Sequence, residues 1–205
     1  MDEINYIRSF ISFDHPHLEA LYNENKSRND LQPSIEPEGA ALICLFIRAC
    51  GCKKVLELGT GNGFSAIWLA AVLKEAGGHL WTVDNHVRTN TEAEERIKEA
   101  GLSDYISMVF GDVRERVKGL PGEFDLIFLD CGKSVYPEIY ESLTSMLKPG
   151  GLLIADDTLF SVNPGVRKGL GRYTDEYNKL VFSDKRFYST IIPVGHGLTI
   201  GVKNK

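Results

Sequence analysis

Short apolar runs alternate with longer amphipathic segments from residue 53 onward, and this alternation limits the possible folds more than any other feature of the chain. The runs are rich in β-branched residues and predict strands, while the segments between them have helical spacing. Strands that are apolar along nearly their whole length are typical of a parallel sheet with helices on both faces. The predicted strands are VLEL (55–58), LWTVD (80–84), ISMVF (106–110), FDLIFLD (124–130) and LLIAD (152–156).

The two ends of the chain follow other patterns. Residues 1–50 carry apolar residues three and four apart, which predicts helices, the last starting near Pro37 and ending at Gly51. Near the C-terminus, RFYSTIIPVGHGLTIGVK holds two strand-like runs joined through glycines, which favours an antiparallel hairpin. We therefore predict one domain over residues 1–205, with a helical extension (1–50) before an open, mostly parallel α/β core (53–205).

Composition excludes several classes of protein. A net charge of -5 argues against a protein that coats nucleic acid, because such proteins carry surplus Lys and Arg. The N-terminus begins acidic, unlike a signal peptide, and no apolar run approaches the roughly 20 residues that span a bilayer. The four cysteines include no CxxC pair and are interpreted as reduced thiols. These features predict a soluble, cytoplasmic protein.

A glycine-rich loop follows the first predicted strand and reads Glu57-Leu58-Gly59-Thr60-Gly61-Asn62-Gly63. Alternate glycines let a ligand approach the backbone closely. Phe64 stands where a dinucleotide-binding loop needs its third glycine, so a nicotinamide or flavin cofactor is disfavoured. The carboxylate of Glu57 suits a cationic ligand such as S-adenosylmethionine, which has an ammonium and a sulfonium group. Alternatively, Glu57 ties the loop to a backbone amide.

An acidic residue ends the second predicted strand. Asp84 lies 21 residues after Gly63, close to the spacing at which such folds place a carboxylate on the two ribose hydroxyls of a nucleoside. Asp112, after the third strand, is a candidate for the adenine edge or an ordinary loop residue.

Three carboxylates follow the fourth and fifth strands. Asp130 ends one strand, and Asp156 and Asp157 end the next. If they converge, their mutual repulsion calls for a cation, and an all-oxygen ligand set suits Mg²⁺ or Ca²⁺. The alternative is that they cap the helices that follow. Lys133 reaches the same edge and is either a solvated charge or a general base.

These segments together resemble the cation-dependent O-methyltransferases of the catechol and caffeoyl-CoA type, including small bacterial members. The resemblance covers about residues 33–203 and rests on VLELGTGNGFSAIWLA, WTVD, FDLIFLDCGKSVYPEIY, LKPGGLLIADDTLF and PVGHGLTIGVK, in the order of the family. It implies a Rossmann-like class I methyltransferase fold with a seven-stranded sheet, an antiparallel C-terminal hairpin strand, and a homodimer.

The resemblance also implies roles for individual residues. Asp130, Asp156 and Asp157 stand at the metal positions, with Mg²⁺ expected and Ca²⁺ or Mn²⁺ as alternatives. Lys133 and Asp130 stand at the catalytic positions. The implied contacts to S-adenosylmethionine come from Ile35, Glu57, Gly59, Gly61, Ser65, Asp84, Val113 and Asp130.

Two positions depart from the family pattern. The family usually has Asp-Asn where this chain has Asp156-Asp157, which adds a charge but keeps an oxygen ligand. His196 stands where members often carry Asp, and we expect it to be a turn residue.

The expected function is cation-assisted methyl transfer from S-adenosylmethionine to a small hydroxylated acceptor with vicinal oxygens, such as a catechol. One alternative acceptor is 5-hydroxyuridine at the wobble position of tRNA, because residues 164–188 carry six basic against three acidic residues. Another alternative is a protein that binds S-adenosylmethionine without catalysis. No membrane partner is expected.

Overall fold

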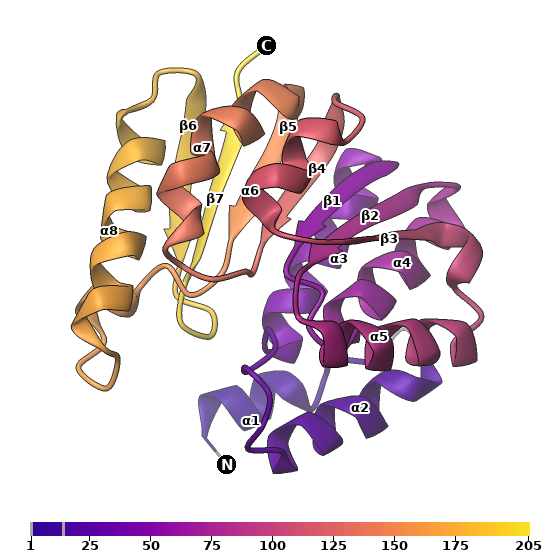
Figure 1. Ribbon diagram of the computed structural model, residues 1–205. Coiled ribbons are helices and arrows are strands. Elements are labelled where there is room, and N and C mark those ends of the chain that lie inside the picture. Colours follow the sequence, from indigo (N-terminus) through magenta and orange to yellow (C-terminus); the bar gives the residue numbers. More distant parts are fainter. Residues whose placement is uncertain (1, 14) are drawn as a thin grey trace.

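Seven strands form one mixed sheet in the computed structural model, which describes residues 2–13 and 15–205 (Figure 1). The order of strands across the sheet is β3-β2-β1-β4-β5-β7-β6. The strands are β1 (Lys54–Leu58), β2 (His79–Asp84), β3 (Ile106–Phe110), β4 (Phe124–Leu129), β5 (Leu147–Ala155), β6 (Phe187–Ile192) and β7 (Leu198–Lys203). All neighbours pair in parallel except β7, which is antiparallel to both β5 and β6, so the predicted hairpin is confirmed.

Eight α-helices are assigned in the described residues. They are α1 (Glu3–Arg8), α2 (Pro16–Ser27), α3 (Pro37–Cys50), α4 (Phe64–Ala76), α5 (Val87–Glu99), α6 (Val113–Arg116), α7 (Val135–Met146) and α8 (Lys168–Ser183). Three short 3-10 turns, η1 (Ser103–Tyr105), η2 (Val117–Gly119) and η3 (Phe160–Val162), complete the order. None of the helices in the described ranges is long and apolar enough to cross a membrane.

The helices cover the sheet in two layers. One apolar cluster joins the sheet to α2, α3, α4 and α5, and includes Trp68 and Phe64 of α4 with no more than 1% of their surface exposed. The other joins it to α6, α7 and α8, which lie together along one side of the sheet in Figure 1. Neighbouring residues of β1 point to opposite clusters, Val55 to the first and Leu56 to the second, as expected for a strand buried on both faces.

Local sequence signals mark the element ends well. Pro37 occupies the first turn of α3, and Gly51 ends that helix with a left-handed backbone (φ 64°). The largest error in a predicted strand boundary is at β5, which begins at Leu147 rather than at residue 152. Leu147 pairs with Phe124 before a register shift, so the stretch LKPGG extends the strand instead of ending the preceding helix.

The strand order reverses between β1 and β4. From β1 the chain builds outward to β2 and β3, and then returns to place β4 on the other side of β1. The N–H of Asp130 donates to the carbonyl of Leu58 at 2.8 Å, so the two strand ends lie side by side. Open α/β sheets bind ligands at such a reversal, beyond the carboxyl ends of the strands.

Candidate active site

Three glycines with left-handed backbone follow β1. Gly59, Gly61 and Gly63 have φ values of 110°, 52° and 95°. A Cβ on Gly59 would lie 2.2 Å from the carbonyl oxygen of Asp130, so the loops after β1 and β4 approach closely only because that position is glycine. A Cβ on Gly61 would meet nothing within 4 Å, so there the backbone conformation requires glycine. This loop presents bare backbone at the reversal point.

The carboxylate of Asp84, at the end of β2, faces this loop. Its Oδ2 accepts the N–H of Gly61 at 2.9 Å, and its Oδ1 accepts the N–H of His86 at 2.8 Å. These bonds fix the carboxylate beside the loop, and each oxygen keeps a lone pair for another donor. The glycine loop and Asp84, predicted to meet from their spacing, do lie together.

Glu57 lies under the glycine loop and is fully buried. Its Oε2 accepts the hydroxyl of Thr82 at 2.6 Å, and the Thr82 hydroxyl also lies 2.6 Å from that of Thr60. Oε1 has no hydrogen-bond partner within the described part of the chain. Burial raises the pKa of Glu57 to about 7, although hydrogen bonds from the hydroxyls of Ser65 and Thr82 oppose the shift. An unpaired buried carboxylate oxygen is costly in a folded chain, so this atom points to a donor or a positive charge supplied by a ligand.

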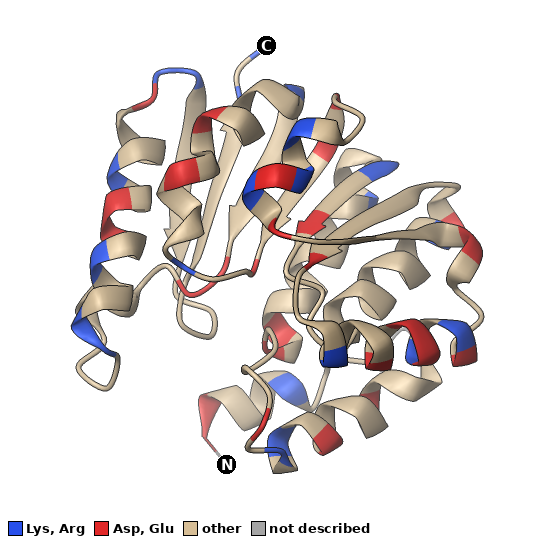
Figure 2. Cartoon of the chain, in the orientation of Figure 1, with Lys and Arg blue, Asp and Glu red and all other residues tan. Residues whose placement is uncertain are grey.

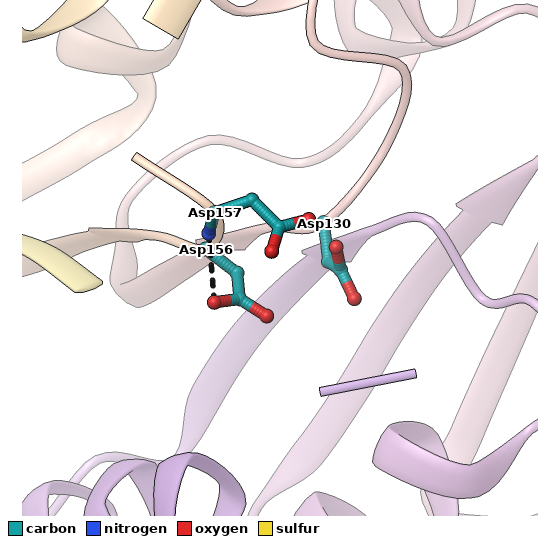
Figure 3. Close-up of side chains that lie close together, drawn as sticks. All are labelled: Asp130, Asp156 and Asp157. Atoms are coloured by element: carbon teal, nitrogen blue, oxygen red, sulfur yellow. Dashed lines mark hydrogen bonds between the residues drawn. The ribbon is translucent and has the colours of Figure 1, made fainter. Parts of the chain in front are cut away.

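Three carboxylates converge beyond β4 and β5, where Figure 3 shows Asp130, Asp156 and Asp157 together. One oxygen of each lies within 4.8 Å of the others. The N–H of Asp156 donates to the carbonyl of Leu129 at 2.9 Å, which brings the two strand ends into register. Asp157 has a left-handed backbone (φ 61°), and its N–H donates to Oδ1 of Asp156 at 2.7 Å. The sequence prediction that these strand ends meet is therefore correct.

Lys133 inserts its ammonium between two of these carboxylates. Its Nζ lies 3.1 Å from Oδ1 of Asp130 and 2.9 Å from Oδ2 of Asp157, and its side chain is only 8% exposed. The same Nζ donates to the hydroxyl of Tyr136 at 2.9 Å. That hydroxyl lies 2.8 Å from the carbonyl of Leu129 and 3.2 Å from that of Asp156, and both can accept its proton. The lysine is thus a buried, fixed charge rather than a solvated one.

The sequence profile of the O-methyltransferase family matches residues 8–204. The chain belongs to this family. The sequence is 28% identical over 159 residues to a catechol O-methyltransferase of Niastella koreensis, covering 76% of this chain and 72% of that protein. The match confirms the predicted family, whose members transfer a methyl group from S-adenosylmethionine to an oxygen atom.

Solved structures of other O-methyltransferases have the same fold. The Bacillus cereus O-methyltransferase, crystallised with S-adenosylhomocysteine, superposes with a TM-score of 0.86 at 22% identity, over 98% of this chain and 96% of that one. TomG from Streptomyces achromogenes, crystallised with S-adenosylmethionine, gives 0.85 at 21% identity, over 98% and 95%. These likenesses confirm the predicted Rossmann-like methyltransferase fold.

A pocket of this O-methyltransferase opens beside the acidic cluster. Asp156 and Asp157 form one wall, and the turn before β7, with Gly195 and His196, forms another. The third wall is the segment that enters α3, lined by Pro33, Ser34, Ile35, Glu36 and Gly39. His196 lies in the turn as predicted and in addition borders the pocket.

The remaining predicted cofactor contacts lie at different places along the same edge of the sheet. Ser65 is buried in the first turn of α4, directly after the glycine loop. Val113 opens α6 after β3, and Asp112 caps that helix by accepting the N–H of Arg114 at 2.8 Å. Ile35 lines the pocket near Asp156 and Asp157.

The charges of the cluster perturb one another. Burial and the proximity of Asp157 raise the pKa of Asp130 to about 6, although Lys133 opposes the shift. Burial likewise holds the pKa of Asp156 well above its ordinary range. Burial alone would lower the pKa of Lys133, but Tyr136 and the carboxylates keep it well above its usual value. Lys133 is therefore a cation in this arrangement.

Sequence reasoning missed Tyr136. Tyr136 lies in the first turn of α7, three residues after Lys133 in the turn that leads into this helix, so its closeness in sequence could have drawn attention to it. The role of its hydroxyl depends on two backbone carbonyls from β4 and the loop after β5, which no local pattern reveals.

Proposed function

We propose that this O-methyltransferase requires a divalent cation and methylates a small acceptor with two neighbouring oxygens, such as a catechol. The observation that carries the proposal is the convergence of Asp130, Asp156 and Asp157, with ligand atoms within 4.8 Å of one another. An all-oxygen donor set without thiol or imidazole fits a hard cation, with Mg²⁺ as the first choice and Ca²⁺ or Mn²⁺ as alternatives. Acidic groups often gather on surfaces without an ion, but Asp156 is buried and adjoins a pocket.

S-adenosylmethionine fits the edge formed by the glycine loop. Two neighbouring carboxylates, Asp84 and Asp130, lie close enough to Glu57 to raise its pKa. The negative potential of these three acidic residues favours a cationic ligand. The unpaired Oε1 of Glu57 and the bare backbone of Gly59 and Gly61 support the same ligand. The proposed contacts are Ile35, Glu57, Gly59, Gly61, Ser65, Asp84, Val113 and Asp130.

The reaction forms a bond between the acceptor oxygen and the methyl carbon while the bond from that carbon to sulfur breaks. The bonding pair passes to sulfur and leaves S-adenosylhomocysteine. A cation on the three carboxylates would stabilise the acceptor oxyanion. Lys133, held by Asp130, Asp157 and Tyr136, would accept or share the hydroxyl proton at its Nζ once it has lost its own proton. It can act as a base only when its two carboxylate partners are neutralised, because they raise its pKa.

A small acceptor is favoured over tRNA. Two of the six basic residues that suggested a nucleic-acid surface are ion-paired: Lys179 with Asp175 at 2.6 Å, and Arg186 with Glu141 and Asp184 at 2.6 and 2.7 Å. In α8 one acidic band, made by Asp175 and Glu176, lies between basic residues, as Figure 2 shows. The relative from Niastella koreensis, named a catechol O-methyltransferase, supports a catechol-like acceptor.

The test measures S-adenosylhomocysteine formation with a simple catechol and, in parallel, with tRNA, each with Mg²⁺ and with EDTA. We expect turnover of the catechol that EDTA abolishes and added Mg²⁺ restores. Turnover resistant to EDTA would overturn the cation requirement. Turnover of tRNA alone, with loss of binding at high salt, would transfer the assignment to RNA. Cofactor binding without turnover of any acceptor tested would favour the non-catalytic alternative.

A further inference from the structure

Asn62 is a buried side chain inside the glycine loop. It stands between Gly61 and Gly63, and only 3% of its surface is exposed. Its amide makes two reciprocal hydrogen bonds with Asn25 of α2: Nδ2 of Asn25 donates to Oδ1 of Asn62 at 3.2 Å, and Nδ2 of Asn62 donates back to Oδ1 of Asn25 at 2.5 Å. A buried amide needs such partners, so the loop is tied to a helix far earlier in the chain.

The same Asn25 also contacts a residue that lines the pocket beside the acidic cluster. Its Nδ2 donates to the hydroxyl of Ser34 at 3.1 Å, and Ser34 lines that pocket together with Asp156 and Asp157. One amide on α2 therefore contacts both the glycine loop and Ser34, a residue in the wall of the pocket beside the acidic cluster.

Other contacts hold α2 in this position. Leu18 and Leu21 are buried in the core beneath it. Arg28, just after α2, pairs with Glu92 of α5 at 2.6 Å, and Glu24 pairs with Arg96 of α5 at 2.6 Å. Arg96 also donates to the backbone carbonyl of Asn62 at 3.2 Å. Because α2 is anchored independently of Asn25, removing the Asn25 amide should release the Asn62 side chain without releasing the helix.

We infer that Asn25 is a positioning residue for the S-adenosylmethionine site, acting through Asn62. The glycines on either side of Asn62 give the loop many accessible backbone conformations, and the Asn25 amide acts with Asp84 and Arg96 to hold one of them before the ligand arrives. Without the Asn25 amide the ligand itself must order the part of the loop around Asn62, and binding weakens by the cost of that ordering. The inference rests on the proposed cofactor site, and it assigns part of that site to the helical extension.

The test compares Asn25→Ala with Asn23→Ala, an exposed asparagine on the same helix. Loss of the paired hydrogen bonds should weaken S-adenosylhomocysteine binding about tenfold by titration calorimetry in Asn25→Ala, and by less than about twofold in Asn23→Ala. In steady state the KM for S-adenosylmethionine should rise by a similar factor in Asn25→Ala, while kcat at saturating cofactor stays within about twofold. A general loss of folded protein would lower kcat instead.

A double-mutant cycle supplies the second measurement. Asn62→Ala alone, and Asn25→Ala with Asn62→Ala together, should weaken binding no more than about twofold beyond Asn25→Ala, because each change removes the same contact. Equal affinities for Asn25→Ala and Asn23→Ala, or losses that add in the double variant, would overturn the inference while leaving the cofactor site intact. Failure of the wild-type protein to bind S-adenosylhomocysteine would overturn both.

Discussion

Lys133 and Asp157 form an ion pair of 2.9 Å in which the acid has a left-handed backbone and the lysine is almost fully buried. A non-glycine residue in that conformation is uncommon, and Asp and Asn tolerate it best because their short side chains bond locally. The family resemblance of the sequence implies Asn at this position, and because Asn tolerates the same backbone, the difference made by Asp157 is its added charge. That charge faces the lysine.

Asp157→Asn should therefore preserve the fold and remove one of the two ion pairs that hold the Lys133 ammonium in place. Removing one of three carboxylates weakens the attraction for a divalent cation, so we expect the Mg²⁺ concentration for half-maximal activity to rise about tenfold, with activity retained at saturation. A Mg²⁺ titration of S-adenosylhomocysteine formation measures this. The control is Asp157→Ala, which removes the ligand oxygen and should not recover at any Mg²⁺ concentration. An unchanged Mg²⁺ requirement in Asp157→Asn would remove Asp157 from the cation site.

Tyr136→Phe tests whether the hydroxyl positions Lys133. The change removes the acceptor of the Lys133 ammonium and the donor shared by two buried carbonyls. We expect a loss of about 1–3 kcal/mol in the free energy of unfolding by urea, and a fall in kcat of about tenfold with little change in cofactor affinity.

Tyr140→Phe is the matched control for that experiment. Its hydroxyl donates to Asp184 at 2.8 Å, away from the acidic cluster, so it should lower stability and leave kcat unchanged. If both variants lost the same activity, the effect of Tyr136 would be one of stability alone.

The parts of the site that sequence could predict are those where a local rule places a side chain. Each predicted carboxylate follows an apolar strand, and parallel strands bring their carboxyl ends to one edge, so Asp84, Asp130 and Asp156 were found from the pattern. The glycine loop was predictable for the same reason, since its left-handed residues need glycine.

The unpredicted parts depend on contacts between distant segments. The pairing of Asn25 with Asn62 joins residues 37 positions apart, and the bond from Tyr136 to the carbonyl of Asp156 spans 20. The polar residues involved have no periodicity and lie on surfaces that become buried only when the elements pack. The start of β5 was missed because Pro149 and two glycines in LKPGG are typical of the end of a helix, while pairing with β4 overrides that local preference.

Asp130→Ala should abolish methyl transfer while the protein stays folded. The residue is shared between the proposed cation site, the ion pair with Lys133 and the edge of the cofactor site, so several contributions are lost together. A fall in kcat/KM of more than about a hundredfold is expected, measured as S-adenosylhomocysteine formation, with the thermal unfolding midpoint as the check on folding. Full activity of the variant in EDTA would contradict the catalytic assignment.

Glu57 should make stability fall as pH rises. Its folded-state pKa of about 7 exceeds the ordinary value of 4.5, so between these values the folded chain holds a proton that the unfolded chain has released. The contribution is present in full below the unfolded value and is lost as pH rises to about 7, amounting to about 3 kcal/mol. Urea unfolding without cofactor, at several pH values from 4.5 to 8, gives the free energy of unfolding as a function of pH. The prediction is a steeper fall for the wild type than for Glu57→Gln, whose side chain cannot ionise.

The exposed Glu95→Gln is the control, and its free energy of unfolding should change with pH as steeply as that of the wild type. If Glu57→Gln also kept the wild-type slope, the buried carboxyl would not be the group that holds the extra proton.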